Sequence, residues 1–329
     1  MIDSKLDLTN IKRVDVSCYD SCKCFDDNLI LVSLNGCLGL IDFNGNEIIK
    51  PIYDSIEKYN DFLIKVGMNK QFSLVNRNGY FLNERFYDSI GELKNGVAKI
   101  ELDGKFGYIN NLGIEIIKPI YSNVRDFFEN IAAVSYKGDW GFIDINGNII
   151  SSTIYDRVGD FSDGVAVVRN RKKVGLIDNY GNLIVDFDRY SEIKKFSCDY
   201  SVVKNINNKY GFIDKYGIEK ITPKYDKAYS FINELAWVKS NGKYGLIDKD
   251  ENFIIFPTYD NVEFKYNFVI VSQDDYVGVF DNNCNLILPV MYKEISFLSN
   301  EYICVDGYLY SISDILKKDS YVKKLTKDK

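Results

Sequence analysis

Residues 140–156, WGFIDINGNIISSTIYD, contain the pattern from which the rest of the chain can be interpreted. An aromatic residue, a glycine, a short apolar run, a glycine turn and a Tyr-Asp pair follow one another, and residues 210–226, YGFIDKYGIEKITPKYD, repeat this order. A Tyr-Asp-like pair marks nine registers spaced 33 to 35 residues apart: Tyr19, Tyr53, Tyr87, Tyr121, Tyr155, Tyr190, Tyr225, Tyr259 and Tyr292. Recurrence at this period indicates a repeat protein.

Each unit is predicted to form three short strands. Residues 165–168 are an example of the first strand, 141–144 of the second and 115–121 of the third. Asn-Gly or Asp-Gly pairs such as Asn35-Gly36 and Asp103-Gly104 separate the first two strands and favour type I′ hairpins. The fold class is therefore all-β, an array of about nine 34-residue three-stranded antiparallel meanders.

The glycine and proline positions follow the same period. The glycine of the aromatic-Gly pair recurs at Gly39, Gly107, Gly141, Gly175, Gly211, Gly245 and Gly278, and Ser73 takes its place in the second unit. All five prolines fall near the end of the third strand, at Pro51, Pro119, Pro223, Pro257 and Pro289. Because proline cannot donate to a β-ladder, the third strand is predicted to be the outer one.

The first strand shows which residues face a core. One column is entirely β-branched (Val32, Val66, Ile100, Val134, Val168, Val203 and Val238), and small residues lie two positions earlier. The position between them is mixed and includes Lys65, Lys99 and Trp237, so we expect it to be partly exposed. These three residues are the candidate partner-binding residues.

Composition excludes several kinds of site. The 329 residues include 41 Lys plus Arg, 47 Asp plus Glu and no histidine, with a net charge of −6. Ser/His/Asp, Cys/His and His-ligated zinc sites are therefore excluded. The acidic balance argues against a nucleic-acid partner. The polar first residues and the lack of a long apolar run predict a cytoplasmic protein without a membrane span.

Three recurring features suggest chemistry, and each has a structural explanation that we favour. Cys18, Cys22 and Cys24 form a cluster, but Cys22 falls in an apolar core column, so no metal site is expected. The acids and amides that end the second strand fit Asx turns, and the Asp after the repeat tyrosine fits backbone capping. The repeated aromatic residues fit packing between units better than a stacking ladder for sugars or bases.

The repeat resembles the WG-repeat family, on Trp140-Gly141-Phe142-Ile143-Asp144 with Tyr155-Asp156 and on the matching residues 210–226. This resemblance covers residues 14–310 and implies a bacterial β-repeat array without a general catalytic role. We expect an N-terminal lead-in over 1–13, one continuous array over 14–311 and a Lys-rich C-terminal cap or tail over 312–329. A lone third strand is expected near 14–19 and a lone pair of first and second strands near 302–311. These elements could complete one another and close a ring, or they could be the two ends of an open stack. An open superhelical solenoid is favoured over a closed propeller-like ring.

Two functions remain as hypotheses. The first is a non-catalytic scaffold that presents an extended surface to another protein. The alternative is a carbohydrate or small-ligand binding module that uses aromatic clefts between repeats. No catalytic residue, cofactor or metal is expected, since no nucleophile, base and oxyanion site can be assembled from the sequence.

Overall fold

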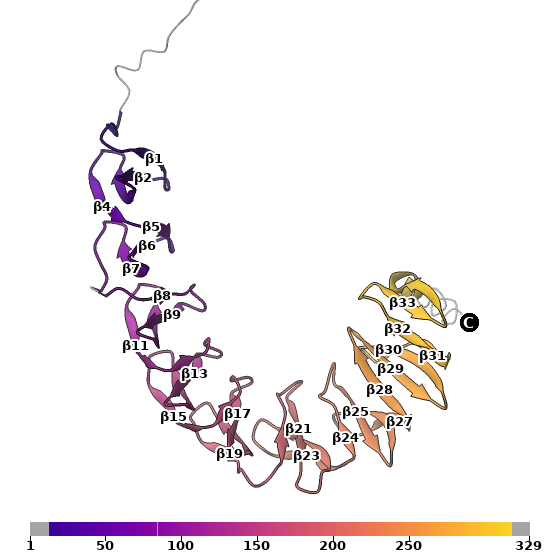
Figure 1. Cartoon of the computed structure of the whole chain (residues 1–329). Helices are drawn as coiled ribbons and strands as arrows, with labels where there is room; N and C mark the ends of the chain where they lie inside the picture. The colour runs from indigo at the N-terminus through magenta and orange to yellow at the C-terminus, as the bar shows by residue number, and fades with distance from the viewer. Residues whose placement is uncertain (1–12, 84, 318–329) are drawn as a thin grey trace, which may run out of the picture. The chain divides into compact units, whose positions relative to one another are not determined.

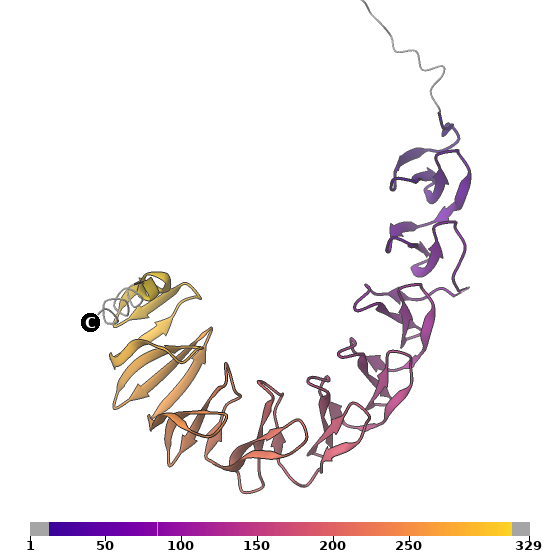
Figure 2. The same cartoon turned by 180° about the vertical axis from the view of Figure 1, so that it is seen from behind.

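The computed structural model describes residues 13–83 and 85–317, which form nine small antiparallel β-sheets (Figure 1). The chain divides into two compact units, Met1–Ile154 and Tyr155–Lys329. Figure 2 shows the same sheets from behind. The all-β repeat architecture predicted from the sequence is confirmed.

The first unit contains four sheets. They consist of β1 (Ser21–Cys24), β2 (Leu29–Leu34), β3 (Cys37–Asp42) and β4 (Glu47–Tyr53); β5 (Ser55–Lys58), β6 (Leu63–Met68) and β7 (Gln71–Asn76); β8 (Ser89–Ile90), β9 (Val97–Leu102), β10 (Lys105–Asn110) and β11 (Glu115–Tyr121); and β12 (Asn123–Val124), β13 (Ile131–Tyr136), β14 (Asp139–Asp144) and β15 (Ile149–Tyr155).

The second unit contains five sheets. They consist of β16 (Arg157–Val158), β17 (Val165–Asn170), β18 (Lys173–Asp178) and β19 (Leu183–Val185); β20 (Glu192–Ile193), β21 (Tyr200–Lys204), β22 (Tyr210–Asp214) and β23 (Glu219–Tyr225); β24 (Lys227–Ala228), β25 (Leu235–Ser240), β26 (Lys243–Asp248) and β27 (Phe253–Tyr259); β28 (Asn261–Lys265), β29 (Phe268–Gln273), β30 (Tyr276–Asp281) and β31 (Leu286–Tyr292); and β32 (Ile295–Phe297), β33 (Tyr302–Val305) and β34 (Tyr308–Ser311).

Most sheets have one strand more than the sequence predicted. Seven of the nine are four-stranded, because the residues after each Tyr-Asp pair form a short strand that pairs with the next strand along the chain. In β8 and β12 this strand is only two residues long. Such a segment is too short to show an alternating pattern, so periodicity does not reveal it.

The hairpin turns have the predicted geometry. In Asn35-Gly36 both central residues have positive φ, 53° and 80°, and Asn241-Gly242 has 50° and 79°. These are the left-handed conformations that a type I′ turn requires. The Asn-Gly and Asp-Gly pairs therefore set the register of the two central strands.

Consecutive sheets within a unit pack face to face, and the apolar cores lie between them. In the first unit, Val97 and Tyr108 of one sheet contact Val134 and Ile143 of the next. The opposite face of the same sheet, with Ala98 and Ile100, packs against the preceding sheet. Because both faces are covered, alternation along a strand does not separate buried from exposed positions here.

The outer strand passes very close to the repeat glycine. A β-carbon on Gly245 would lie 2.6 Å from the carbonyl oxygen of Ile255 and 2.8 Å from the nitrogen of Pro257. The register between β26 and β27 shifts between Tyr244 and Leu246, across this contact, and again between Leu246 and Ile247. Because glycine has no side chain, the backbone of the outer strand β27 can pass close over β26 at the bulge that contains Pro257.

The two ends of the array differ from the repeats between them. Residues 13–20 form no strand, so the third strand expected near 14–19 is wrong; there the Ser17 backbone N–H and hydroxyl both donate to Asp15 Oδ1 in a turn. The final strand pair is present as β33 and β34. Residues 312–317 are helical, and Ile312 and Ile315 of this helix pack against the core of the last two sheets.

Candidate functional site

The acids and amides at the end of the second strand form Asx turns, as predicted. Asp42 Oδ1 accepts hydrogen bonds of 2.8 Å from the backbone N–H groups of Asn44 and Asn46. Hydrogen bonds from the side chain and backbone of Asn46 lower the pKa of Asp42 to about 2. The side-chain oxygens of Asn76, Asn110, Asp144, Asp178, Asp214, Asp248 and Asp281 accept the equivalent backbone bonds.

The aspartate of the Tyr-Asp pair also accepts backbone hydrogen bonds. Asp54 Oδ2 accepts the N–H of Asn69 at 2.7 Å, and Asp88 Oδ2 accepts the N–H of Asp103 at the same distance. The donors lie in the hairpin turn of the sheet that begins after the aspartate. The predicted capping role is confirmed, and these carboxylates hold turns together.

Most repeat tyrosines connect one sheet to the next. Tyr87 and Tyr225 are 1% and 2% exposed, and the hydroxyl of Tyr225 donates to Glu251 at 2.8 Å. Tyr190 likewise donates to Glu219 at 2.6 Å. The preference for packing over a stacking ladder is therefore confirmed for these tyrosines.

Trp237 is buried, so its predicted partial exposure is wrong. Its side chain is 3% exposed and lies between Tyr259 and Phe280, with ring centroids 6.0 and 5.8 Å away. The column that contains Trp237 faces the next sheet, which covers it. The indole Nε1–H has no hydrogen-bond acceptor among the residues that the structure describes. Trp237 therefore offers no surface to a partner.

Lys65 and Lys99 remain partly exposed, but both form ion pairs within the chain. Lys65 Nζ lies 2.9 Å from Glu57 and 5.1 Å from the centre of the Phe72 ring. Lys99 Nζ lies 2.7 Å from Asp126, which belongs to the next sheet. A role for these lysines in partner binding stays a prediction.

The cysteine cluster at the beginning of the array is exposed. Cys18, Cys22 and Cys24 are all free thiols on the surface, so the expected burial of Cys22 is wrong. The equivalent Ile56 and Ile90 are buried. Cys22 differs because β1 belongs to the first sheet, and among the described residues no sheet precedes it. Over the same residues, no group of three or more potential ligands could hold a metal ion.

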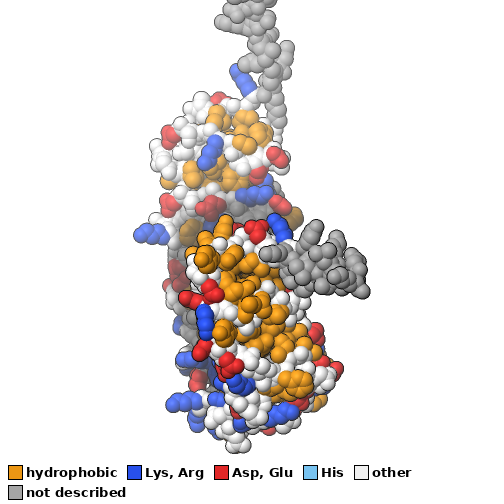
Figure 3. Space-filling model, turned by 90° about the vertical axis from the view of Figure 1, so that its right-hand side faces the viewer, with side chains coloured by type: hydrophobic (Ala, Val, Ile, Leu, Met, Phe, Trp, Pro, Cys, Tyr) orange, Lys and Arg blue, Asp and Glu red, His pale blue; other side chains and the backbone are white. Residues whose placement is uncertain are grey.

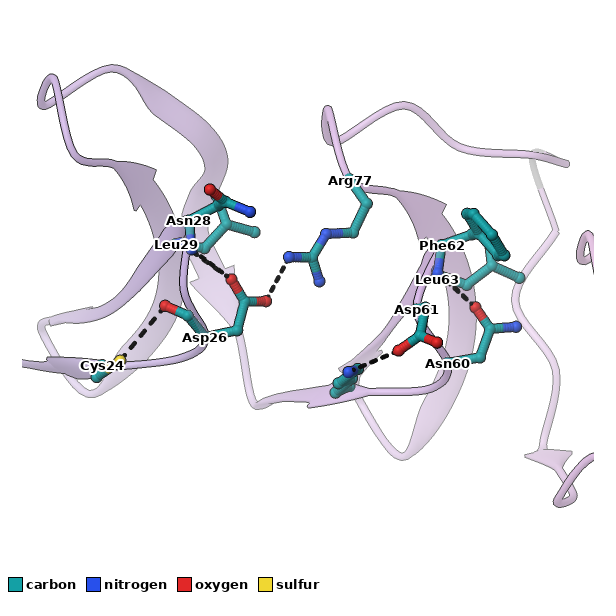
Figure 4. A network of polar contacts seen from close by, with 10 residues as sticks. Cys24, Asp26, Asn28, Leu29, Asn60, Asp61, Phe62, Leu63 and Arg77 are labelled. Atoms are coloured by element: carbon teal, nitrogen blue, oxygen red, sulfur yellow. Dashed lines mark hydrogen bonds and ion pairs between the residues drawn. The ribbon is translucent and has the colours of Figure 1, made fainter.

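An ion pair joins the first two sheets. Arg77, after β7, reaches the carboxylate of Asp26 between β1 and β2, with an N–O distance of 2.5 Å (Figure 4). Burial raises the pKa of Asp26, but the N–H of Asn28 and the Arg77 guanidinium outweigh it and lower the pKa overall. Like the tyrosines, this pair stabilises the array rather than forming a reactive site.

The least expected feature is an apolar surface on the outer strands of the second unit. Ile254 and Phe256 of β27 are 55% and 73% exposed, and Leu286 and Met291 of β31 are 44% and 61% exposed. We call these four residues the outer-strand patch. Figure 3 shows hydrophobic side chains gathered on the side of the molecule that carries these strands.

The outer-strand patch lies on strands without charged residues. The sequences of β27 and β31 are FIIFPTY and LILPVMY, whereas β4, β11 and β23 expose Lys50, Lys118 and Lys224. Charged residues normally protect a free sheet edge from pairing with other chains. The third strand β15, IISSTIY, also lacks charge, but its centre is Ser151-Ser152-Thr153. A long third strand with neither a charged residue nor a polar centre is the signal by which the patch could have been found.

Stacked open sheets with Asx turns and glycine crossings define a β-repeat protein. The model of the WG containing repeat matches residues 39–69, 106–139, 140–173, 175–210, 210–244 and 244–276, more than half of the chain. The chain therefore belongs to the WG-repeat family.

Solved structures show only distant similarity. A eukaryotic initiation factor is 12% identical with a TM-score of 0.35, over 86% of this chain and 95% of that one. Hsv2 from Kluyveromyces marxianus is 16% identical with a TM-score of 0.33, over 64% and 84%. BamB from Moraxella catarrhalis is 10% identical with a TM-score of 0.29, over 81% and 94%.

No protein with a curated description matches the chain. Within residues 13–83 and 85–317, no helix has the length and apolar character that crossing a membrane requires.

Proposed function

We propose that this WG-repeat protein is a non-catalytic scaffold whose extended surface binds another protein. The outer-strand patch is the observation that carries the proposal. It combines exposed apolar side chains with sheet edges that no charged residue protects, and such surfaces mark interaction sites. A partner segment in extended conformation can pair with an edge strand of this kind.

The proposal also includes a cytoplasmic location. All seven cysteines are free thiols, and reduced cysteines are usual in the cytoplasm. The structural roles found for the recurrent acids and tyrosines support a scaffold over an enzyme, because these residues are engaged in turns and in contacts between sheets.

The test compares two double variants. Phe256→Lys with Met291→Lys places charge on the outer-strand patch. Ile52→Lys with Ile120→Lys makes the same change on outer strands of the first unit, where both isoleucines are 51% exposed. Proteins captured from an extract of the source cells by the unmodified chain are identified by mass spectrometry.

We expect a specific partner to be retained by the Ile52/Ile120 variant and lost from the Phe256/Met291 variant. Circular dichroism confirms that both variants are folded. Capture of no protein by the unmodified chain, or full retention by the Phe256/Met291 variant, contradicts the proposal.

A cavity favours the second candidate function, the binding of a carbohydrate or small ligand. It has a volume of about 670 Å³ and is lined by residues of β31, the last sheet and the C-terminal helix, among them Pro289, Tyr292, Tyr310 and Asp314. Aromatic side chains beside a carboxylate suit a sugar ring. Binding on a glycan array that Tyr310→Ala abolishes would support this function, and an array without any binding would contradict it.

A further inference from the structure

A row of basic residues crosses three consecutive sheets of the second unit. Arg157 lies opposite Arg169 between β16 and β17, and Lys227 lies opposite Lys239 between β24 and β25. In the sheet between them, Lys204 lies opposite Glu192. We call Arg157, Arg169, Lys204, Lys227 and Lys239 the basic row.

The position of the basic row is neutral in most other sheets. The same paired positions hold Ser21 and Ser33, Ser55 and Gly67, Asn123 and Ser135, or Asn261 and Ser272. Like charges directly opposite one another destabilise a sheet. Because the fold accepts serine and asparagine at this position, stability does not explain the two like-charged pairs.

The cations of the basic row form no ion pairs among the residues that the structure describes. No ion pair within 4.0 Å joins any of the five to a carboxylate among the described residues, including Glu192 opposite Lys204. Asp226 and Asp260 form their ion pairs with Lys209 and Lys243, and the charge of Lys239 lowers the pKa of both carboxyl groups only from beyond ion-pair distance. The row therefore presents five cations without an ion pair among the described residues, on a chain whose net charge is −6.

Aromatic rings hold the lysines of the row in place. Lys227 Nζ lies 4.8 Å from the centre of the Tyr229 ring, and Lys239 Nζ lies 4.9 Å from that of Tyr244. Lys204 Nζ lies 5.5 Å from the Tyr210 ring. A cation over an aromatic face is attracted by the ring while it stays accessible to a ligand.

We propose that the basic row binds an acidic, extended segment of a partner protein. This inference rests on the proposed scaffold function and names the chemistry of its partner. Paired cations on successive sheets are complementary to carboxylates spaced along an extended peptide.

Two observations favour a peptide over a nucleic acid. Glu192 interrupts the row, and a peptide can place an uncharged residue there, whereas a phosphate backbone carries charge at every step. The tyrosine faces are also occupied: Tyr229 packs 4.6 Å from Phe264 and 6.3 Å from Tyr244. Tyr229 and Tyr244, which hold the lysines of the like-charged pair, are therefore not open for the base stacking that single strands use.

The test measures binding of the full chain to a fluorescein-labelled peptide of alternating glutamate and serine, by fluorescence anisotropy. Lys227→Asn with Lys239→Ser introduces the residue types that the chain itself has at Asn123 and Ser135. Lys50→Asn with Lys118→Asn removes the same charge from exposed outer strands of the first unit. Thermal unfolding verifies that each variant is folded.

We expect the Lys227/Lys239 variant to bind the peptide about tenfold more weakly and the Lys50/Lys118 variant to stay within about twofold of the unmodified chain. Equal losses in the two variants would overturn the inference, since they would indicate general charge attraction. Tighter binding of oligothymidylate or of phosphatidylserine vesicles than of the peptide would overturn the choice of partner. If the outer-strand patch still captures a partner while the acidic peptide fails to bind, the scaffold function stands without this inference.

Discussion

At the residue scale, the repeat glycine is the position most sensitive to substitution. We expect Gly245→Ala to lower the free energy of unfolding by about 1–3 kcal/mol, because the new methyl group would collide with the backbone of β27. Urea denaturation measures the change. Gly159→Ala is the control, since a β-carbon there has no neighbour closer than 3.6 Å. Equal stability of Gly245→Ala and the unmodified chain would contradict this account of the glycine.

The Asx turns give a prediction about pH. The pKa of Asp42 is lowered from its usual 3.8 to about 2, so the turn contributes stability above pH 3.8 and loses it as the pH falls through about 2. Carbon-detected NMR titration of the Asp42 carboxyl group measures this pKa. Asn46→Ala is expected to raise it, because the largest stabilising hydrogen bond is removed. An unchanged titration in that variant would show that another group is responsible.

Sequence patterns predict the role of a residue when that role depends on its neighbours along the chain, and they fail when it depends on another strand. The recurrence of Asp42 and its equivalents before a turn was enough to assign Asx chemistry, because the side chain bonds its own neighbours. The requirement for glycine at 245 depends instead on a backbone crossing from another strand. Such a contact joins residues ten apart, and local patterns do not contain it.

At the scale of the element, Trp237 tests how strand β25 is packed. We expect Trp237→Ala to lower the free energy of unfolding by about 3–5 kcal/mol through the cavity that it leaves. Trp237→Phe should lower the free energy of unfolding much less, because it keeps an aromatic ring at this position and removes the buried indole N–H, which has no acceptor among the described residues. Chemical denaturation of both variants measures the difference.

Fluorescence provides an independent control on the same strand. In a Trp140→Phe background the emission comes from Trp237, and we expect it to be blue-shifted and poorly quenched by acrylamide because the side chain is 3% exposed. Quenching like that of a free indole would contradict the packing of β25 between its neighbouring sheets.

The error over Trp237 has the same origin as the missing fourth strand. A three-stranded meander with one solvated face would expose the column of Lys65, Lys99 and Trp237. Sheets that are stacked on both sides bury it or pair its charges, as Lys99 does with Asp126. Sequence alternation reports which residues share a face, but the number of covered faces depends on the stacking.

At the scale of the whole molecule, the period of the repeat predicted the architecture, and the surfaces were not predicted. Nine registers and their turns follow from residues that recur. The outer-strand patch and the basic row consist of residues that differ between repeats, such as Phe256 and Lys227. A periodic analysis treats these differences as noise, although binding surfaces of a repeat protein are expected to lie where the repeats diverge.

The choice between an open solenoid and a closed ring stays a prediction, and one residue favours the open form. Ring closure requires residues 14–19 to pair with β34 as the missing outer strand. In the sheet that ends with β27, Gly245 lies opposite Val238, the buried valine of the first strand. In the last sheet the equivalent valine is Val305, and Tyr308 lies opposite it.

A side chain at this position obstructs the crossing backbone. In the second sheet Ser73 replaces the glycine, and isolated bridges, Phe72 with Tyr87 and Val75 with Phe81, stand in place of an outer strand among the described residues. Tyr308 should obstruct an added strand more strongly than serine does. We therefore expect small-angle X-ray scattering to show an elongated particle, and a compact disc would mean that the chain closes despite Tyr308.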